Sequence, residues 1–341
     1  SVFAMNTVTT ASHCLKRYFS SSSENEIAMS EIAIDKPILL IALGGNALIK
    51  KGQQGTIEEQ FENLSLPVKQ IARLSKEYRI IITHGNGPQV GNLLLQQECC
   101  QEVPILPLEI LVAQTEGQIG YMIESSLDEA LMEIGIPYRP LISLITYVVV
   151  DKADPAFKNP TKPIGPIYSE SVIRSLPYPT MKTAKGYRRV VASPQPVTII
   201  EKREIKTLID MDFIIICCGG GGIPVIRKGR SFNGVDAVVD KDLASAKLAR
   251  EVGVDIFLIA TDVSGVYLNY GTENKKMLES ITLKAAMDYH EAGQFPKGSM
   301  GPKVTAAVKF AQHTGKRAVI TAVDQIEKAV AKKSGTEIIP D

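Results

Sequence analysis

The sequence predicts an α/β fold in which helices cover a mainly parallel β-sheet. Short apolar runs rich in β-branched residues recur along the chain, and such runs are typical of strands buried on both faces of a parallel sheet. Segments with apolar residues at helical spacing lie between these runs. Three of the runs end directly at glycines. In a doubly wound sheet such junctions lie along one edge, where ligands bind.

The composition is that of an ordinary globular protein. Its 341 residues are 45% hydrophobic and 22% charged, with a net charge of +1, and no apolar run approaches the length of a membrane span. We therefore expect a soluble protein with no membrane or nucleic-acid partner. The five cysteines include two adjacent pairs, which suit neither a disulfide framework nor zinc-ligand spacing and indicate a reducing compartment. The four histidines leave little for a serine or cysteine triad.

The first 35 residues differ in composition from the rest. No acidic residue occurs before Glu24, and basic residues stand among Ser, Thr and Ala, which is typical of a transit peptide. We predict that residues 1–35 are a targeting-like extension that directs the protein to an organelle matrix of the mitochondrial type, in a mitochondrion or hydrogenosome. The alternative is a tail without a purpose on a cytoplasmic protein.

Two strand-to-glycine junctions lie early in the remaining segment, 36–341, which we predict to be one domain. The strand Pro37 to Leu43 is followed at once by Gly44, Gly45 and Asn46. Residues 56–76 have helical spacing and should cover the sheet. The strand Arg79 to Thr83 then leads into His84-Gly85-Asn86-Gly87-Pro88-Gln89-Val90-Gly91. Glycines let backbone N–H groups approach an anion closely, which favours phosphate.

The spacing of Gly85, Gly87 and Gly91 matches a dinucleotide fingerprint, but its context does not fit. That fingerprint needs a second strand ending in an acid about 20 residues further on, and the corresponding region, 107–134, has a helical pattern. No Gly-x-x-x-x-Gly-Lys-Ser/Thr motif occurs, which excludes an ordinary P-loop NTPase. A phosphate binder of another class is expected.

The pattern changes after a predicted strand at 139–150. Residues 151–189 combine several prolines and many basic residues with interspersed apolar and aromatic ones. Long irregular segments inside compact domains are usually lids or disordered linkers, and the apolar content favours a small, folded, protruding lid subdomain. A basic lobe beside a phosphate site would attract an anionic substrate. A solvated surface or a dimer contact is the alternative.

We expect the site to form around the third junction. The strand Phe213 to Cys218 ends at Gly219, Gly220, Gly221 and Gly222. A helix then opens at Val-Asp-Lys-Asp, where Asp240 can act as its cap. Lys241 would lie between two carboxylates at a helix N-terminus, close to where the glycines bring a phosphate. Each feature alone is about as often purely structural.

Two further strands complete the predicted sheet. Residues 255–261 run into a turn that ends at Tyr267, whose ring could border an adenine. Before the last strand, 317–322, Pro302 is expected at the first position of a helix. Lys303 would then lie in the first turn of that helix.

Six blocks of the sequence resemble the carbamate kinases of the amino-acid kinase superfamily. They occur in order from about Lys36 to the C-terminus: Ala-Leu-Gly-Gly-Asn-Ala (42–47), His-Gly-Asn-Gly-Pro-Gln-Val-Gly (84–91), Asp-Pro-Ala-Phe-Lys-Asn-Pro-Thr-Lys-Pro-Ile-Gly-Pro (154–166), Cys-Gly-Gly-Gly-Gly-Ile-Pro-Val (218–225), Val-Val-Asp-Lys-Asp-Leu-Ala (238–244) and Gly-Ser-Met-Gly-Pro-Lys-Val (298–304). The third and sixth blocks point to carbamate kinases rather than to amino-acid kinases in general. The N-terminal extension departs from the family pattern.

The resemblance implies the amino-acid kinase fold, an open, mainly parallel sheet sandwiched by helices, usually in a homodimer. It implies reversible transfer of the γ-phosphoryl group of ATP to carbamate, giving carbamoyl phosphate and ADP. ATP or ADP would bind as a substrate that carries Mg²⁺. The reverse direction would make ATP in arginine catabolism, by the arginine deiminase pathway.

Phosphoryl transfer requires positioning and charge neutralisation rather than a covalent nucleophile. We expect Lys241 and Lys303 to supply positive charge, Asp242 to orient them, and Lys162 to reach the substrate from the lid. The expected substrate-binding residues are Gly44, Gly45, Asn46, Gly85 and Asn86. The expected nucleotide-binding residues are Gly219, Gly220, Gly221, Gly222, Thr261, Asp262, Val266 and Tyr267. No metal-binding residue is expected.

Two other hypotheses stay open. A different amino-acid kinase, such as an acetylglutamate, glutamate or aspartate kinase, would need a larger substrate pocket. A catalytically silent sensor of nucleotide or carbamoyl phosphate would be favoured by loss of the three lysines, and all three are present.

Overall fold

The computed structural model describes residues 36–340 except 101, 137–138, 184–185 and 297, so the expected targeting extension lies outside the described residues. The main element is an eight-stranded sheet in the order β15-β17-β16-β12-β1-β2-β9-β3. Neighbouring strands are parallel except for β16 and β17. This confirms the predicted α/β fold. The strands are β1 (Ile38–Leu43), β2 (Arg79–His84), β3 (Leu141–Ser143), β9 (Ile214–Ile216), β12 (Ile256–Thr261), β15 (Ser280–Thr282), β16 (Arg317–Ala322) and β17 (Thr336–Ile339).

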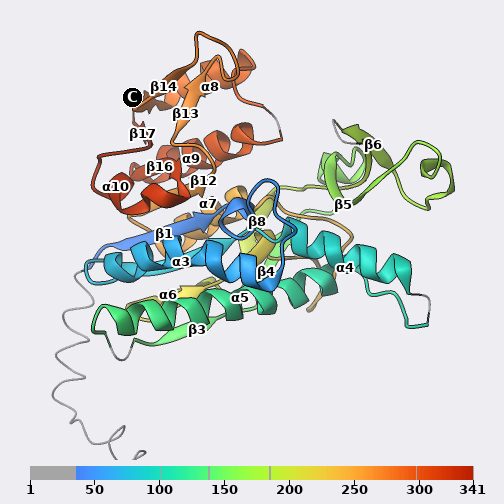
Figure 1. Ribbon diagram of the computed structural model, residues 1–341, viewed down its shortest axis with the longest axis horizontal. Coiled ribbons are helices and arrows are strands. Elements are labelled where there is room, and N and C mark those ends of the chain that lie inside the picture. The colour runs from blue at the N-terminus through green and yellow to red at the C-terminus, as the bar shows by residue number, and fades with distance from the viewer. Residues whose placement is uncertain (1–35, 101, 137–138, 184–185, 297, 341) are drawn as a thin grey trace, which may run out of the picture.

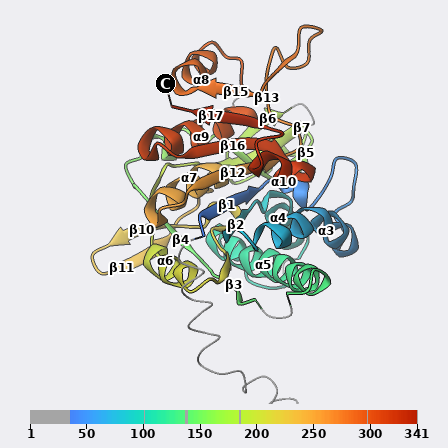
Figure 2. The ribbon, with the colours of Figure 1, turned by 90° about the vertical axis from the view of Figure 1, so that its left-hand side faces the viewer.

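Strand β1 shows why the sheet needs helices on both faces. All six of its residues are buried, and alternate side chains of a strand point to opposite faces. Leu39 and Ile41 join one core cluster, with α3, α5 and α10, whereas Leu40 and Ala42 join a second cluster, with α6 to α9. Figure 2 shows these helix layers on opposite sides of the strands. The helices are α3 (Ile57–Leu74), α5 (Leu108–Glu133), α6 (Lys202–Asp210), α7 (Lys241–Val252), α8 (Leu283–Glu291), α9 (Met300–Thr314) and α10 (Ile326–Val330).

Local signals set the ends of several helices. Thr56 caps α3 through a capping box with Glu59, close to the predicted start. Asp240 caps α7, as predicted, and α7 ends at Gly253 in the left-handed conformation. Helix α9 begins two residues earlier than predicted, because Ser299 is its N-cap and Met300 its first residue. Lys303 still lies in its first turns.

Two predictions about the first half of the chain were incomplete. The predicted strand 139–150 divides into β3 and β4 (Tyr147–Val150), which belong to different sheets. The backbone N–H of Thr146, between them, donates to the carboxylate of Glu116 instead of to a neighbouring strand. The glycine segment after β2 continues into α4 (Gly87–Cys99), which has proline in its first turn.

Smaller sheets surround the main one. Strands β4 and β8 (Pro196–Ile199) pair with β10 (Ile223–Lys228) and β11 (Ser231–Gly234) in the order β11-β10-β4-β8. Strands β13 (Val266–Leu268) and β14 (Lys276–Leu278) form a hairpin. Strands β5 (Lys162–Tyr168) and β6 (Thr180–Thr183) lie within the predicted lid segment, 151–189, and flank β7 (Gly186–Val191) in a separate antiparallel sheet.

The lid sheet projects away from the helical layers, next to α4 (Figure 1). The hydroxyls of Tyr168 and Tyr178 both bond to Glu98 of α4. Ile164 of β5 packs with Leu94 of α4 in a third core cluster. No helix in the described part of the chain is long and apolar enough to cross a membrane.

Candidate active site

Four adjacent parallel strands, β12, β1, β2 and β9, bring their carboxyl ends to one edge of the sheet. The backbone there is closely packed. The N–H of Gly44 donates to the carbonyl of Ala260 at 2.8 Å, and that of Gly85 donates to Leu43 at 3.1 Å. A Cβ on Gly44 would lie 2.9 Å from the Ala260 oxygen, so only glycine fits. The predicted strand-to-glycine junctions therefore meet at one place.

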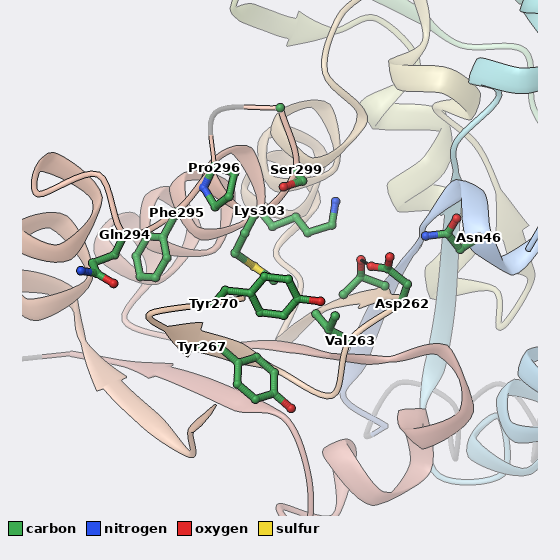
Figure 3. Close-up of a pocket in the computed structure, with 13 residues that line it drawn as sticks. Asn46, Asp262, Val263, Tyr267, Tyr270, Gln294, Phe295, Pro296, Ser299 and Lys303 are labelled. Atoms are coloured by element: carbon green, nitrogen blue, oxygen red, sulfur yellow. Dashed lines mark hydrogen bonds between the residues drawn. The ribbon is translucent and has the colours of Figure 1, made fainter. Parts of the chain in front are cut away.

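Two cavities open at this edge. The larger, about 880 Å³, lies under the lid and is lined by Gly45, Gly85, Asn86, Lys162, Arg188, Gly220, Asp240, Lys241, Asp242 and Lys303, among others. The smaller, about 280 Å³, lies beside the β13–β14 hairpin (Figure 3). Gly298, Ser299 and Lys303 line both cavities. The side chain of Lys303 therefore lies where the two cavities meet.

A buried group of three charges occupies this junction. The Nζ atom of Lys241 lies 2.5 Å from Oδ1 of Asp242, and that of Lys303 lies 3.0 Å from Oδ2. The side chains of Lys241, Lys303 and Asp242 are 13%, 15% and 3% exposed. One carboxylate thus fixes two ammonium groups that come from different helices. Both ammonium groups line the larger cavity.

Burial and neighbouring charges shift the pKa values of Asp242 and Lys241. Burial alone would raise the pKa of Asp242, but Lys241 and Lys303 outweigh it and hold that pKa below its usual value. Burial lowers the pKa of Lys241, and Lys303 lowers it further, whereas Asp242 raises it. Asp242 is therefore ionised, and it opposes loss of the proton from Lys241.

The lid contributes a third lysine to the larger cavity. Lys162, the first residue of β5, lies with its Nζ atom 2.8 Å from Oδ2 of Asp240. The other oxygen of Asp240 accepts the N–H groups of Asp242 and Leu243 at the start of α7. The predicted catalytic residues, Lys241, Lys303, Asp242 and Lys162, therefore line one cavity.

The glycine turn after β9 lies beneath this cavity. Among its four glycines Gly220 is a lining residue of the larger cavity, and none of the four lines the smaller one. A Cβ on Gly220 would lie 2.1 Å from the side chain of Asn86, and one on Gly221 would lie 2.3 Å from the carbonyl of Val239. The turn thus allows the Asn86 segment and the start of α7 to approach each other.

Two buried ionisable side chains support the turn from below. A Cβ on Gly219 would lie 2.5 Å from the ring of His84 and 2.9 Å from Cγ of Glu116. Burial lowers the pKa of His84 to about 4. Burial raises the pKa of Glu116 well above its usual range, although the N–H groups of Thr146 and Gly219 lower it. Burial therefore favours the uncharged form of both side chains.

Three of the residues expected to bind the nucleotide, Thr261, Asp262 and Tyr267, line the smaller pocket together with Asn46. Asn46 was expected on the substrate side, with Gly45 and Gly85. Figure 3 shows Asn46, Asp262 and Lys303 at one end of the pocket and Gln294 and Phe295 at the other. Five expected residues are buried and line neither cavity: Gly44, Gly219, Gly221, Gly222 and Val266.

Sequence reasoning missed several lining residues. Tyr270, Gln294, Phe295 and Pro296 line the smaller pocket, and Arg188 and Asp240 line the larger cavity. Phe295 and Pro296 lie within three residues of Gly298, where the Gly-Ser-Met-Gly-Pro-Lys block begins, and this proximity was the available signal. In the described part of the chain no three His, Cys, Asp or Glu side chains gather as metal ligands.

Comparison with known proteins gives a consistent result. The model of the amino acid kinase family matches residues 37–322. The carbamate kinase of Thermococcus kodakarensis is 46% identical over 311 residues, which are 88% of this chain and 98% of the relative. That of Trichomonas vaginalis is 42% identical over 313 residues, 89% of this chain and 99% of the relative. A solved carbamate kinase from Giardia lamblia, bound to AMP-PNP, superposes with a TM-score of 0.83 at 38% identity, covering 90% of this chain and 99% of that one.

Proposed function

The chain belongs to the amino acid kinase family, as an enzyme of the carbamate kinase type, and from this premise we propose that it works physiologically to make ATP from MgADP and carbamoyl phosphate in arginine catabolism. The observation that carries the assignment of the site is the junction of the two cavities at Lys303. A nucleotide in one cavity and a small anion in the other would present the transferred phosphoryl group there.

In the proposed reaction an oxygen of carbamate attacks the γ-phosphorus of ATP, and the bond from that phosphorus to the bridging oxygen of ADP breaks. In the reverse direction a β-phosphate oxygen of ADP attacks carbamoyl phosphate and carbamate leaves. No protein nucleophile is needed. Lys241 and Lys303 stabilise the charge of the transferred group, and Asp242 fixes both lysines. Mg²⁺ arrives with the nucleotide as part of the substrate.

The remaining site residues would divide between the two cavities. Gly45 and Asn86 would offer backbone and amide donors to carbamate, and Lys162 approaches it from the lid. The N–H of Gly85 is bonded to Leu43, so Gly85 contributes by leaving space beside Gly45 and Lys241. Thr261, Asp262 and Tyr267 would bind the nucleotide, with Asn46 beside them. Gly220 and Gly221 would act by letting Asn86 and the start of α7 come together, and Gly219 and Gly222 by fitting against His84, Glu116 and Val148, which is a supporting role rather than the nucleotide contact expected from the sequence.

We further propose a homodimer and an organellar location. The strand β3 is an edge of the main sheet, and Ile110, Tyr121 and Met132 on the adjacent helix α5 are exposed. This surface suits a second copy of the chain. Light scattering on the purified protein measures the mass directly.

For the location, residues 1–35 fused to a fluorescent protein should enter the organelle, and diffuse fluorescence would refute targeting.

The decisive experiment is a coupled assay of ATP formation. Purified protein with MgADP is given carbamoyl phosphate, acetyl phosphate or acylglutamyl phosphate. Carbamoyl phosphate should be used with much the highest kcat/KM. A preference for acylglutamyl phosphate would indicate another amino-acid kinase, and no turnover with any of the three would indicate a sensor.

A further inference from the structure

One carboxylate joins the lid to the helix that carries the transfer lysine. Oδ1 of Asp240 caps α7 by accepting from Asp242 N at 3.0 Å and Leu243 N at 3.4 Å. Oδ2 accepts from the ammonium of Lys162 at 2.8 Å. The two oxygens therefore contact different parts of the molecule, 78 residues apart in the chain.

We propose that Asp240 is a positioning residue for phosphoryl transfer, which holds the ammonium of Lys162 at the larger cavity before the substrate anion enters. This inference rests on the proposed function. Without the carboxylate, the ammonium of Lys162 would turn toward water, because its side chain is 31% exposed and Lys162 is the first residue of β5. Returning the ammonium of Lys162 to the cavity at each turnover would cost side-chain entropy.

The position of this ion pair distinguishes it from the lid's other contacts. Asp240 is 16% exposed and lines the cavity together with Lys162. A second lid residue, Arg189, pairs with Asp236, whose side chain is 61% exposed and does not line the cavity. Exposed ion pairs contribute little because solvent screens them. A partly buried, charge-assisted hydrogen bond is stronger and holds its geometry better.

The division between the two oxygens allows the roles to be separated by mutation. Asp240→Asn keeps an oxygen that can cap α7, since asparagine caps helices as well as aspartate does. It replaces the other oxygen by an amide nitrogen, which cannot accept a hydrogen bond from Lys162. Asp240→Ser is a second variant that can keep the cap without the ion pair. Retained melting temperatures verify that α7 is intact.

The test is a double-mutant cycle with Lys162→Ala. We expect Asp240→Asn to lower kcat/KM for carbamoyl phosphate on the order of 10-fold, the value of one hydrogen bond to a charged group, and to leave KM for MgADP unchanged. Combined with Lys162→Ala it should add no further loss, because Asp240 acts through that lysine. Asp236→Asn, the matched control at the other lid pair, should resemble the parent enzyme.

Hydrogen exchange provides a readout that needs no turnover. In the ligand-free protein, Asp240→Asn should speed exchange of β5 amides, and Asp236→Asn should do so much less. Unchanged β5 exchange, or losses that multiply in the double variant, would overturn the proposal, since Asp240 would then act through the cap or through Lys241. A parent protein inactive toward carbamoyl phosphate would refute the proposed function and leave the exchange result to decide the role of the pair.

Discussion

The shared carboxylate makes Asp242→Asn the most informative single substitution. The asparagine keeps the shape of the side chain and removes the charge that both lysines contact, at 2.5 Å for Lys241 and 3.0 Å for Lys303. A hydrogen bond to a charged group contributes about 1.5–3 kcal/mol, and each ~1.4 kcal/mol changes a rate about tenfold. Loss of both contacts should therefore lower kcat on the order of 10²-fold or more. Initial rates of ATP formation at saturating MgADP and carbamoyl phosphate measure it.

The same variant should change the pH dependence of the reaction. Burial lowers the pKa of Lys241, and Asp242 opposes that shift. Once the carboxylate is neutral, Lys241 loses its proton at lower pH, so the alkaline limb of the kcat profile should move to lower pH. The control is Asp288→Asn, which removes a carboxylate from the exposed side of α8 outside both cavities. If Asp242→Asn kept both the kcat of the parent enzyme and the parental position of the alkaline limb, the role given to Asp242 would be refuted.

Five more variants test other parts of the site. Lys241→Ala and Lys303→Ala should each lower kcat on the order of 10²-fold or more and raise KM for MgADP far less; an unchanged kcat would remove that lysine from the mechanism. Tyr270→Ala should raise KM for MgADP and leave KM for carbamoyl phosphate unchanged, because the ring lines the smaller pocket; equal rises would contradict the assignment of the pockets. Burial lowers the pKa of His84 from 6.5 to about 4, so between these pH values the free energy of unfolding should rise by ~1.4 kcal/mol per pH unit. Burial raises the pKa of Glu116 from 4.5, so above that pH this residue should make the free energy of unfolding fall as the pH rises. Urea unfolding at several pH values measures this dependence. In Glu116→Gln the free energy of unfolding should rise with pH because of His84, and in His84→Gln it should fall with pH because of Glu116. A pH dependence equal to the parent's in both variants would refute the assigned protonation states.

The sheet and its helices were predictable because their signals are local. Strands such as β1 and β12 are short apolar runs, and the caps at Thr56 and Asp240 lie next to the helices that they start. Lys241 and Asp242 could be placed at the site because they follow a capping residue directly. Lys303 lies 61 residues from Asp242. Its place at the site was inferred only from the family resemblance and from its position in the first turn of a helix.

The features that sequence reasoning missed depend on contacts between distant segments. No glycine or proline marks the break between β3 and β4, and the bond from Thr146 to Glu116 spans 30 residues. Asn46 and Gly45 are adjacent, yet they line different cavities, because the direction of each group at a strand end depends on local backbone angles. The four glycines after β9 were expected to face a ligand, whereas a Cβ on any of them would meet protein atoms, and Gly220 alone of the four lines a cavity.

The shared carboxylate also sets stability against activity in this protein. Removing an ion from water costs several kcal/mol, and replacing buried ion groups by apolar side chains of similar volume is often neutral or stabilising by about 1–4 kcal/mol. Lys241, Asp242 and Lys303 bring three such charges together beneath the surface. Replacing all three by apolar side chains of similar volume is therefore expected to leave the melting temperature unchanged or to raise it, and under the proposed mechanism the more stable protein would be inactive.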